Sequence, residues 1–322
     1  MMKRSYRVLI LLGVILCAAV CLGIVRGSVA IPLSELFSPD YRQILFVRFA
    51  RIMLGILVGS GLGVCGVALQ AILRNPLAEP YLLGTSSGAG LGAVVATALG
   101  ISAVYLPAAA FFGAIVSIIV VYNLAREGNK IPVQSLILSG VIVAIALSGM
   151  IVFLVSLFGN EAMHGMLWWL LGSLQIFDLR LLFIVAAVVL IGISAVFILS
   201  QDLNAISLGE EEAVHLGVKI ETIKKILFFI TALITGALVS ISGMIGFVGL
   251  IIPHMMRLII GPNHRVLIPA ACLGGAAFLV LCDTISRSLF PPVEIPIGVI
   301  TALVGAPVFI VLMKRKQHIK EK

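Results

Sequence analysis

The sequence predicts an all-α integral membrane protein that crosses the bilayer ten times, with both ends of the chain in the cytoplasm. Of its 322 residues, 61% are hydrophobic and 11% are charged, whereas soluble chains have about 45–50% and about 25%. The apolar residues fall in runs of about 17–25 residues, the length that one helix needs to cross a bilayer. These observations exclude an ordinary soluble domain and predict a single transmembrane domain over residues 1–322.

Uncharged runs give the positions of the predicted helices in order. Six runs fit one helix each: residues 8–25, 52–73, 131–160, 181–201, 266–282 and 295–313. Residues 162–177 are apolar but short, and Trp168 and Trp169 within them are typical of a membrane–water interface. This segment is therefore ambiguous and could be an eleventh crossing.

Two further runs are too long for one helix and each predict a pair. Residues 81–125 divide at a turn around Gly100 to Pro107, and residues 226–256 divide at Ser242 and Gly243, with Gly246 just beyond. Two pairs and six single helices make ten crossings.

Lysine and arginine positions set the predicted topology, because cytoplasmic loops of membrane proteins are rich in both. Basic residues crowd the two ends of the chain: Lys3, Arg4 and Arg7, and then Lys314, Arg315, Lys316, Lys320 and Lys322. Both ends are therefore expected in the cytoplasm, which requires an even number of crossings and agrees with ten. The same topology leaves several arginines on the outer side, including Arg48, Arg51 and Arg287.

Glycines recur at every fourth position in two places, a spacing that lets helix backbones approach closely. They are Gly55, Gly59 and Gly63, and Gly84, Gly88 and Gly92. The pattern predicts a tightly packed helical body and identifies no substrate.

Two segments are predicted to interrupt helices at the cytoplasmic side. RNPLAEP spans residues 74–80, and GFVGLIIPHMMR spans residues 246–257 with Pro253 inside an apolar run. Breaks at corresponding places are typical of transporters built from inverted repeats with a pathway between the halves. The halves would be residues 48–160 and 224–313.

The largest polar block, residues 201–225, is long enough for two short cytoplasmic helices. Asn204 or Ser207 could cap a helix, and Gly209 and Gly217 could form turns. Since most connections are short, a loop of this size indicates a docking surface for a cytoplasmic partner.

The outer arginines have two interpretations. Arg48 and Arg51 are three residues apart and share one face of a helix start. Their side chains could reach lipid headgroups, or they could bind the acidic groups of an outside partner or an anionic substrate. Asp283 and Glu294 flank Arg287 and are expected to be its local partners.

Motifs for catalysis and for metal binding are missing from the sequence. It has no G-x-x-x-x-G-K-[ST] phosphate loop and no HExxH motif, and the five cysteines lie in apolar runs. The five histidines are scattered. We therefore expect no enzymatic activity, no metal site and no cofactor on this chain, so that ATP and magnesium would be bound by a partner.

Four segments resemble the FecCD family, the permease subunits of ABC importers for iron-siderophores, haem and cobalamin. The longest is VRFARIMLGILVGSGLGVCGVALQAILRNPLAEPYLLGTSSGAG at residues 47–90. Residues 246–270 and 294–310 resemble two further signatures, and SLGEEEAVHLGV at 207–218 resembles the cytoplasmic coupling loop of the family. The motifs occur in the family order and cover nearly the whole chain.

The resemblance implies a permease that works by alternating access, with inverted repeats made of helices 2–5 and 7–10. It implies three kinds of partner: a second permease copy, two cytoplasmic ATPase subunits and an extracytoplasmic substrate-binding protein. The place implied is the inner, or cytoplasmic, membrane. The cargo would be a ferric siderophore, haem or cobalamin, and the sequence does not choose among them.

The resemblance also implies roles for individual residues. Arg48, Arg51 and Arg287 would dock acidic residues of the binding protein, although Ala50 stands where the family often has proline. Residues of the cytoplasmic gate would be Asn75, Pro76 and Leu77, with Val133 and Gln134. Residues that couple to the ATPase would be Ser207, Leu208, Gly209, Glu210, Ala213, Leu216, Gly217 and Val218.

A different class of transporter is the alternative. An ion-gradient-driven secondary transporter would use Asp283 or Glu294 as its coupling carboxylate and would need no partner chains.

Overall fold

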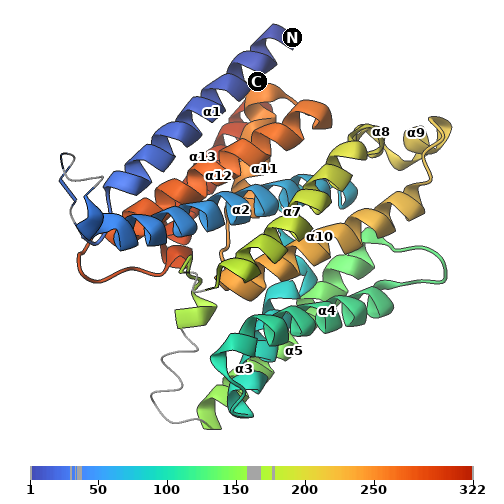
Figure 1. The fold of residues 1–322 in the computed structure, drawn as a ribbon. Coiled ribbons are helices and arrows are strands. Elements are labelled where there is room, and N and C mark those ends of the chain that lie inside the picture. The colour runs from blue at the N-terminus through green and yellow to red at the C-terminus, as the bar shows by residue number, and fades with distance from the viewer. Residues whose placement is uncertain are drawn as a thin grey trace.

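The computed structural model describes residues 2–29, 31–32, 34, 38–157, 168–175 and 178–320, which fold into a bundle of helices (Figure 1). The long helices are α1 (Met2–Val25), α2 (Arg42–Ile72), α3 (Thr85–Ala98), α4 (Leu106–Ala125), α5 (Val133–Leu157), α7 (Leu179–Ile198), α10 (Ile220–Ser242), α11 (Val248–Ile260), α12 (His264–Ser288) and α13 (Ile297–Lys320). The shorter ones are α8 (Ser200–Leu208), α9 (Glu210–His215) and the 3-10 turns η2 (Pro39–Tyr41), η3 (Pro80–Leu83) and η4 (Ala103–Tyr105). No β-strand occurs in these ranges, so the predicted all-α class is confirmed for them.

Each predicted helix overlaps one observed long helix. Seven are long and apolar enough to cross a membrane: α1, α2, α4, α5, α7, α10 and α12. Helices α3 and α11 have 14 and 13 residues, and the apolar part of α13 is also short. The chain is therefore a multi-pass membrane protein, and ten complete crossings stay a prediction.

Helix α2 begins at Arg42, ten residues before the predicted start of its apolar run. Arg48 and Arg51 bounded that run in the sequence, but both side chains are buried among protein partners, so their charges do not end the helix. Of the ambiguous segment 162–177, residues 168–170 are helical and 171–175 are not; the rest lies outside the described residues.

The helix axes run roughly along one direction, so the bundle has two ends (Figure 1). Both chain ends lie at the same end of the bundle as α8 and α9, which agrees with an even number of crossings. At the opposite end lie the end of α1, the turn η2 and residues 289–296, which connect α12 to α13. We call this opposite end the rim end.

Helix α2 packs against α7, α10, α11 and α12, and 89% of its most apolar stretch is buried. Glycine makes the closest of these contacts possible. A Cβ atom added at Gly59 would lie 2.2 Å from the carbonyl oxygen of Gly275 on α12, and one at Gly63 would lie 2.6 Å from that of Ala271. The close helix packing that the glycine spacing predicted is therefore present.

Replacing Gly59 with alanine is expected to destabilise the chain by about 1–3 kcal/mol, because α2 and α12 must separate to admit a methyl group. Thermal unfolding of the purified protein in detergent measures this effect. Gly13→Ala is the matched control, since a Cβ atom at Gly13 of α1 would have no neighbour within 4 Å. Equal melting temperatures for the two variants would contradict the prediction.

The predicted break after α2 is present, whereas of the second predicted segment, residues 246–257, only residues 246 and 247 are non-helical. The first follows α2 over residues 73–79 and continues through η3. The second comprises residues 243–247, and Pro253 lies inside α11 without ending it. The second break is therefore not at the α8–α9 end, contrary to the prediction, because α10 carries the chain from that end to the interior before residue 243.

The two breaks bond to each other. The backbone N–H of Phe247 donates to Glu79 Oε1 at 2.8 Å, and that of Ile245 donates to the Tyr81 hydroxyl at 3.1 Å. Gln70 Nε2 donates to the carbonyl of Leu250 at 3.1 Å. Non-helical backbone inside a membrane needs such protein partners.

Helix lengths also follow the same order around both breaks, long, short, long and long, as the predicted repeat requires.

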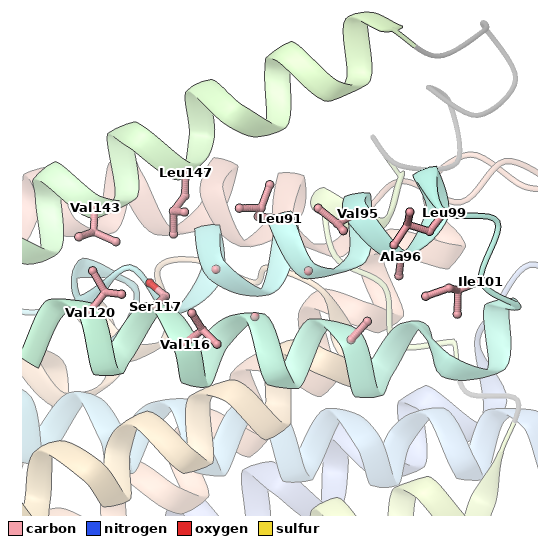
Figure 2. Close-up of a pocket in the computed structure, with 14 residues that line it drawn as sticks. Leu91, Val95, Ala96, Leu99, Ile101, Val116, Ser117, Val120, Val143 and Leu147 are labelled. Atoms are coloured by element: carbon pink, nitrogen blue, oxygen red, sulfur yellow. The ribbon is translucent and has the colours of Figure 1, made fainter.

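An apolar hollow of about 380 Å³ lies between α3, α4 and α5. Figure 2 shows Leu91 and Val95 of α3, Val116 and Val120 of α4, and Leu147 of α5 around it. The hydroxyl of Ser117, which also lines the hollow, donates to the carbonyl of Gly84 at 2.8 Å. This hollow offers no polar group to a hydrophilic ligand, and the candidate site lies elsewhere.

Candidate functional site

Arg51 on α2 holds two carboxylates at the rim end. Its Nε donates to Asp283 Oδ1 and its Nη1 donates to Glu294 Oε2, both at 2.7 Å. Asp283 Oδ2 lies 3.0 Å from Nε of Arg287, one turn further along α12. Gln175 Nε2 donates to the same oxygen of Glu294 at 3.1 Å. We call these five side chains the rim network.

Arg48 and Arg287 also donate hydrogen bonds to backbone carbonyl groups near the end of α1. Arg48 donates to the carbonyl of Ile24 at 2.6 Å and also to that of Val29, and Arg287 donates to the carbonyl of Gly23 at 2.7 Å. The three predicted docking arginines are only 3–7% exposed. Because a buried guanidinium is costly without partners, these bonds explain how three arginines are held so close together.

The predicted partners of Arg287 are correct in part. Asp283 pairs with Arg287 and also with Arg51. Glu294 pairs with Arg51 instead. Gln175 had no signal in the sequence, because it lies 119 residues before Glu294 in an irregular segment.

Two hollows meet at the rim network. The rim recess, about 350 Å³, is lined by all three arginines and by Glu294. The second hollow, which we call the vestibule, has a volume of about 830 Å³ and a mixed polar and apolar lining. Its lining includes Trp168, Trp169, Gln175, Ser240 and Ser242, together with Arg51 and Glu294. The Arg51–Glu294 ion pair therefore lies between the recess and the vestibule.

Glu294 is ionised in this setting. Partial burial opposes its ionisation, but the hydrogen bond from Arg51 and the charge of that guanidinium outweigh burial, so the pKa of Glu294 is below its ordinary value. A carboxyl group whose pKa is lowered by folding stabilises the protein at neutral pH. That contribution is lost only as the pH falls through the lowered pKa.

The predicted gate residues lie in two separate segments. Asn75, Pro76 and Leu77 form a turn after α2, in which Asn75 Oδ1 accepts from the backbone N–H of Leu77 at 2.9 Å. Leu77 is exposed at the surface. Val133 and Gln134 begin α5, half-buried and exposed respectively. Among the described residues no hydrogen bond joins the two segments, and their role as a gate stays a prediction.

Helices α8 and α9 form a compact corner with exposed leucines on its surface. Ala213 is fully buried against Ile206 and Ile220, whereas Leu208 and Leu216 are 69% and 65% exposed. The residues proposed to couple to an ATPase therefore divide into internal and external ones. Ala213 and Gly209 are buried, Glu210 and Val218 are half-buried, and Ser207, Leu208, Leu216 and Gly217 are exposed.

Gly217 ends α9 in the left-handed conformation, with φ of 83°. Its N–H donates to the carbonyl of Val214 and the N–H of Val218 donates to that of Ala213, which is a Schellman motif. The predicted turn at Gly217 is thus present. Ser207 and Asn204 do not cap, since both lie inside α8.

The side chain of Asn204 joins α8 to the start of α12. Asn204 Oδ1 accepts from the backbone N–H of His264 at 2.8 Å and lies 2.9 Å from Nδ1 of the same histidine. Asn204 Nδ2 donates to Asn263 Oδ1 at 3.3 Å. Helix α12 therefore contacts α8 at one end and carries Asp283 and Arg287 of the rim network at the other.

Comparison with known proteins decides the family. The profile described as the FecCD transport family matches residues 12–315, nearly the whole chain. The chain belongs to the FecCD transport family.

Relatives of this FecCD chain are named as permeases. The cobalamin import system permease protein of Halobacterium salinarum is 39% identical over 282 residues, which cover 87% of this chain and 76% of the relative. The molybdate import system permease protein of Haemophilus influenzae is 36% identical over 315 residues, which cover 93% of this chain and 92% of the relative. The FecCD chain is accordingly a transport permease of the inner membrane.

A solved structure shows the same fold. It is described as an inward-facing conformation of a metal-chelate type ABC transporter, and it is 33% identical with a TM-score of 0.87. The superposition covers 96% of this FecCD chain and 99% of that chain. Family, relatives and fold agree that the protein is a FecCD-family ABC importer permease.

Proposed function

We propose that this chain is the transmembrane subunit of an ATP-driven, binding-protein-dependent importer that moves a metal chelate by alternating access. Two permease copies, identical or paralogous, would enclose the pathway, and two cytoplasmic ATPase subunits would bind ATP and magnesium. The chain itself would bind no cofactor. The observation that carries the proposal is a single helix, α12, which contacts α8 at one end and holds the rim network at the other.

The rim recess is the proposed docking place for the substrate-binding protein. Arg48, Arg51 and Arg287 line it together, and their three guanidinium groups exceed the two carboxylates of the rim network by one positive charge. An acidic side chain of the binding protein would complete this charge balance. Docking at the rim end would deliver the cargo beside the vestibule.

The corner made by α8 and α9 is the proposed contact with the ATPase subunits. Exposed Leu208 and Leu216 offer apolar side chains that a groove on a soluble partner can bury. Glu210 pairs with Lys224 of α10 at 2.7 Å, which ties the corner to a long helix. Movement of the ATPase would therefore reach α10 and, through Asn204, α12.

Replacing Asn204 with alanine is expected to uncouple transport from ATP hydrolysis. The variant loses the hydrogen bonds that link α8 to His264, so motion of the corner reaches α12 less completely. In proteoliposomes, the number of cargo molecules moved per ATP hydrolysed should fall about tenfold, as expected for loss of about 1.4 kcal/mol of coupling. Asn204→Asp, which keeps the accepting oxygen, should retain most of the ratio.

Ser194→Ala is the second control for this prediction, because the hydroxyl of Ser194 donates to the carbonyl of Leu190 in its own helix, α7. An unchanged ratio in Asn204→Ala would show that α12 does not transmit the motion through this contact.

The pathway is proposed to run from the vestibule to the gate segments at residues 75–77 and 133–134. The volume of the vestibule, about 830 Å³, and its two tryptophans suit a bulky, partly flat cargo such as a chelate of iron or a corrinoid. A free oxyanion, the cargo named for the relative from Haemophilus influenzae, would occupy only a small part of this space.

Purification of the complex from its own host tests the proposal. The chain, extracted in mild detergent, should co-purify with an ATPase subunit and should capture a binding protein whose bound ligand mass spectrometry identifies. A chain that moves solute without ATP would contradict the proposal and favour ion-driven transport through Asp283 or Glu294. The pairing of both carboxylates with Arg51 argues against that alternative, because paired acids are poor proton carriers.

A further inference from the structure

Among the three rim arginines, Arg51 is the one that already binds two carboxylates. Arg51 is 7% exposed, and Asp283 and Glu294 accept from two of its nitrogens. Arg51 has a third nitrogen, Nη2, but a carboxylate that arrives from outside would bring a third negative charge onto one guanidinium and would repel Glu294 at close range. Docking at this arginine therefore favours the exchange of one carboxylate for another.

The two carboxylates are held very differently. Asp283 lies within α12, has a side chain only 2% exposed and pairs with Arg287 as well as Arg51. Glu294 lies in the irregular segment between α12 and α13, has a side chain 27% exposed and lines the rim recess. Its other partner, Gln175, is also in an irregular segment and is exposed. Glu294 is consequently the carboxylate that can leave.

Departure of Glu294 would alter the vestibule. Arg51 and Glu294 line the rim recess and the vestibule alike, so their ion pair lies between the two hollows. We propose that Glu294 occupies the position on Arg51 that a carboxylate of the docking protein takes when it binds, and that this exchange of carboxylates opens the rim recess into the vestibule. Glu294 is thus a positioning residue that closes the outer entrance until the partner arrives. This inference rests on the proposed docking at the rim.

Charge balance makes the exchange feasible. One carboxylate leaves Arg51 and another takes its place, so no guanidinium is left buried without a partner at the end. Asp283 stays bonded to Arg51 throughout and keeps it in position. Glu294 moves toward solvent, to which it is already partly exposed.

Docking affinity is the first test, measured between the purified permease–ATPase complex in nanodiscs and its binding protein. Glu294→Gln weakens the bond between residue 294 and Arg51. Docking should therefore tighten about tenfold, because one charge-assisted hydrogen bond no longer competes with the incoming carboxylate. Gln175→Leu removes a bond to Glu294 without changing charge and should tighten docking less, about threefold. Unchanged or weaker docking in both variants would overturn the proposal.

Asp40→Asn is the matched control for the charge change. Asp40 is an exposed acid of η2, close in sequence to the start of α2, and its one hydrogen bond among the described residues is from Ser38. The Asp40→Asn variant should keep a docking affinity within about twofold of the wild type, because the interaction of exposed charges is largely screened. Equal tightening in Asp40→Asn and Glu294→Gln would mean general attraction rather than exchange, and would overturn the proposal.

Tryptophan fluorescence provides a second test that needs no partner. The sequence has two tryptophans, Trp168 and Trp169, and both line the vestibule. In the full-length chain in nanodiscs, Glu294→Gln and Gln175→Leu should increase acrylamide quenching, and Asp40→Asn should not. Unchanged quenching in the first two variants would overturn the opening of the vestibule.

The two tests separate failure of this inference from failure of the proposed function. If the wild-type complex binds no binding protein, the proposed docking fails, and the quenching result still decides whether Glu294 closes the vestibule. If docking occurs but neither affinity nor quenching responds to Glu294→Gln, the docking function stands and the exchange is wrong.

Discussion

Replacing Arg51 with glutamine is expected to reduce uptake at least about thirtyfold, since truncation of one partner in a buried charge pair costs about 2–5 kcal/mol. The variant removes the guanidinium that joins the rim recess to the vestibule and leaves Asp283 and Glu294 without their shared cation. Transport into proteoliposomes and binding of the substrate-binding protein both measure the loss.

Arg42→Gln is the control for the loss at Arg51. Arg42 is the first residue of α2, is exposed and makes the same change of charge on the same helix. Uptake should stay within about twofold of the wild type, because exposed charges contribute little. Co-purification of the ATPase subunit with Arg51→Gln verifies that the variant still assembles. Normal uptake by an assembled Arg51→Gln complex would contradict the docking role.

Changing both Leu208 and Leu216 to aspartate is expected to abolish binding of the ATPase subunits. Each leucine is about two-thirds exposed in the isolated chain, and burying a leucine at an interface contributes about 1.5–3 kcal/mol. Two charged replacements at the same corner should lower affinity more than a hundredfold. Size-exclusion chromatography of the detergent-solubilised complex measures the stoichiometry directly.

Thr222→Asp is the control for the corner. Thr222 is exposed in the first turn of α10, where a carboxylate is favourable for the helix. This variant adds negative charge at the same end of the bundle without removing an apolar contact, and it should retain the ATPase subunits. Retained binding by the double aspartate variant would exclude the α8–α9 corner as the interface.

Much of the fold follows from local sequence properties. The position of each long helix is readable from uncharged runs, and the break at residues 243–247 from Ser242, Gly243 and Gly246, because length and backbone freedom are local. The prediction was wrong at the start of α2 and at Pro253, because contacts with other helices outweigh the local sequence rule at both places. Buried arginines with bonded guanidinium groups continue a helix, and neighbouring helices tolerate a proline within one.

The sequence predicts most of the residues that form the candidate site, but not how these residues are arranged. Charge counting and the family resemblance both selected Arg48, Arg51 and Arg287, and the polar block at 201–225 identified the α8–α9 corner. Neither predicted that Arg51 bonds to a residue 243 positions away, nor that Gln175 and Asn204 take part.

Four properties of the protein follow from its amino-acid sequence: the polytopic helical class, the order of the helices, the family and the identity of the charged residues at the two ends of the bundle. These depend on hydropathy over about 20 residues and on motifs that are continuous in the chain. Three further properties depend on how the helices pack: the rim arginines are buried, Glu294 rather than Asp283 is the exposed partner, and Arg51 lies between two hollows. Ion pairs form between side chains that packing brings together, and packing joins α2, α12 and the segment after it across more than 200 residues of sequence.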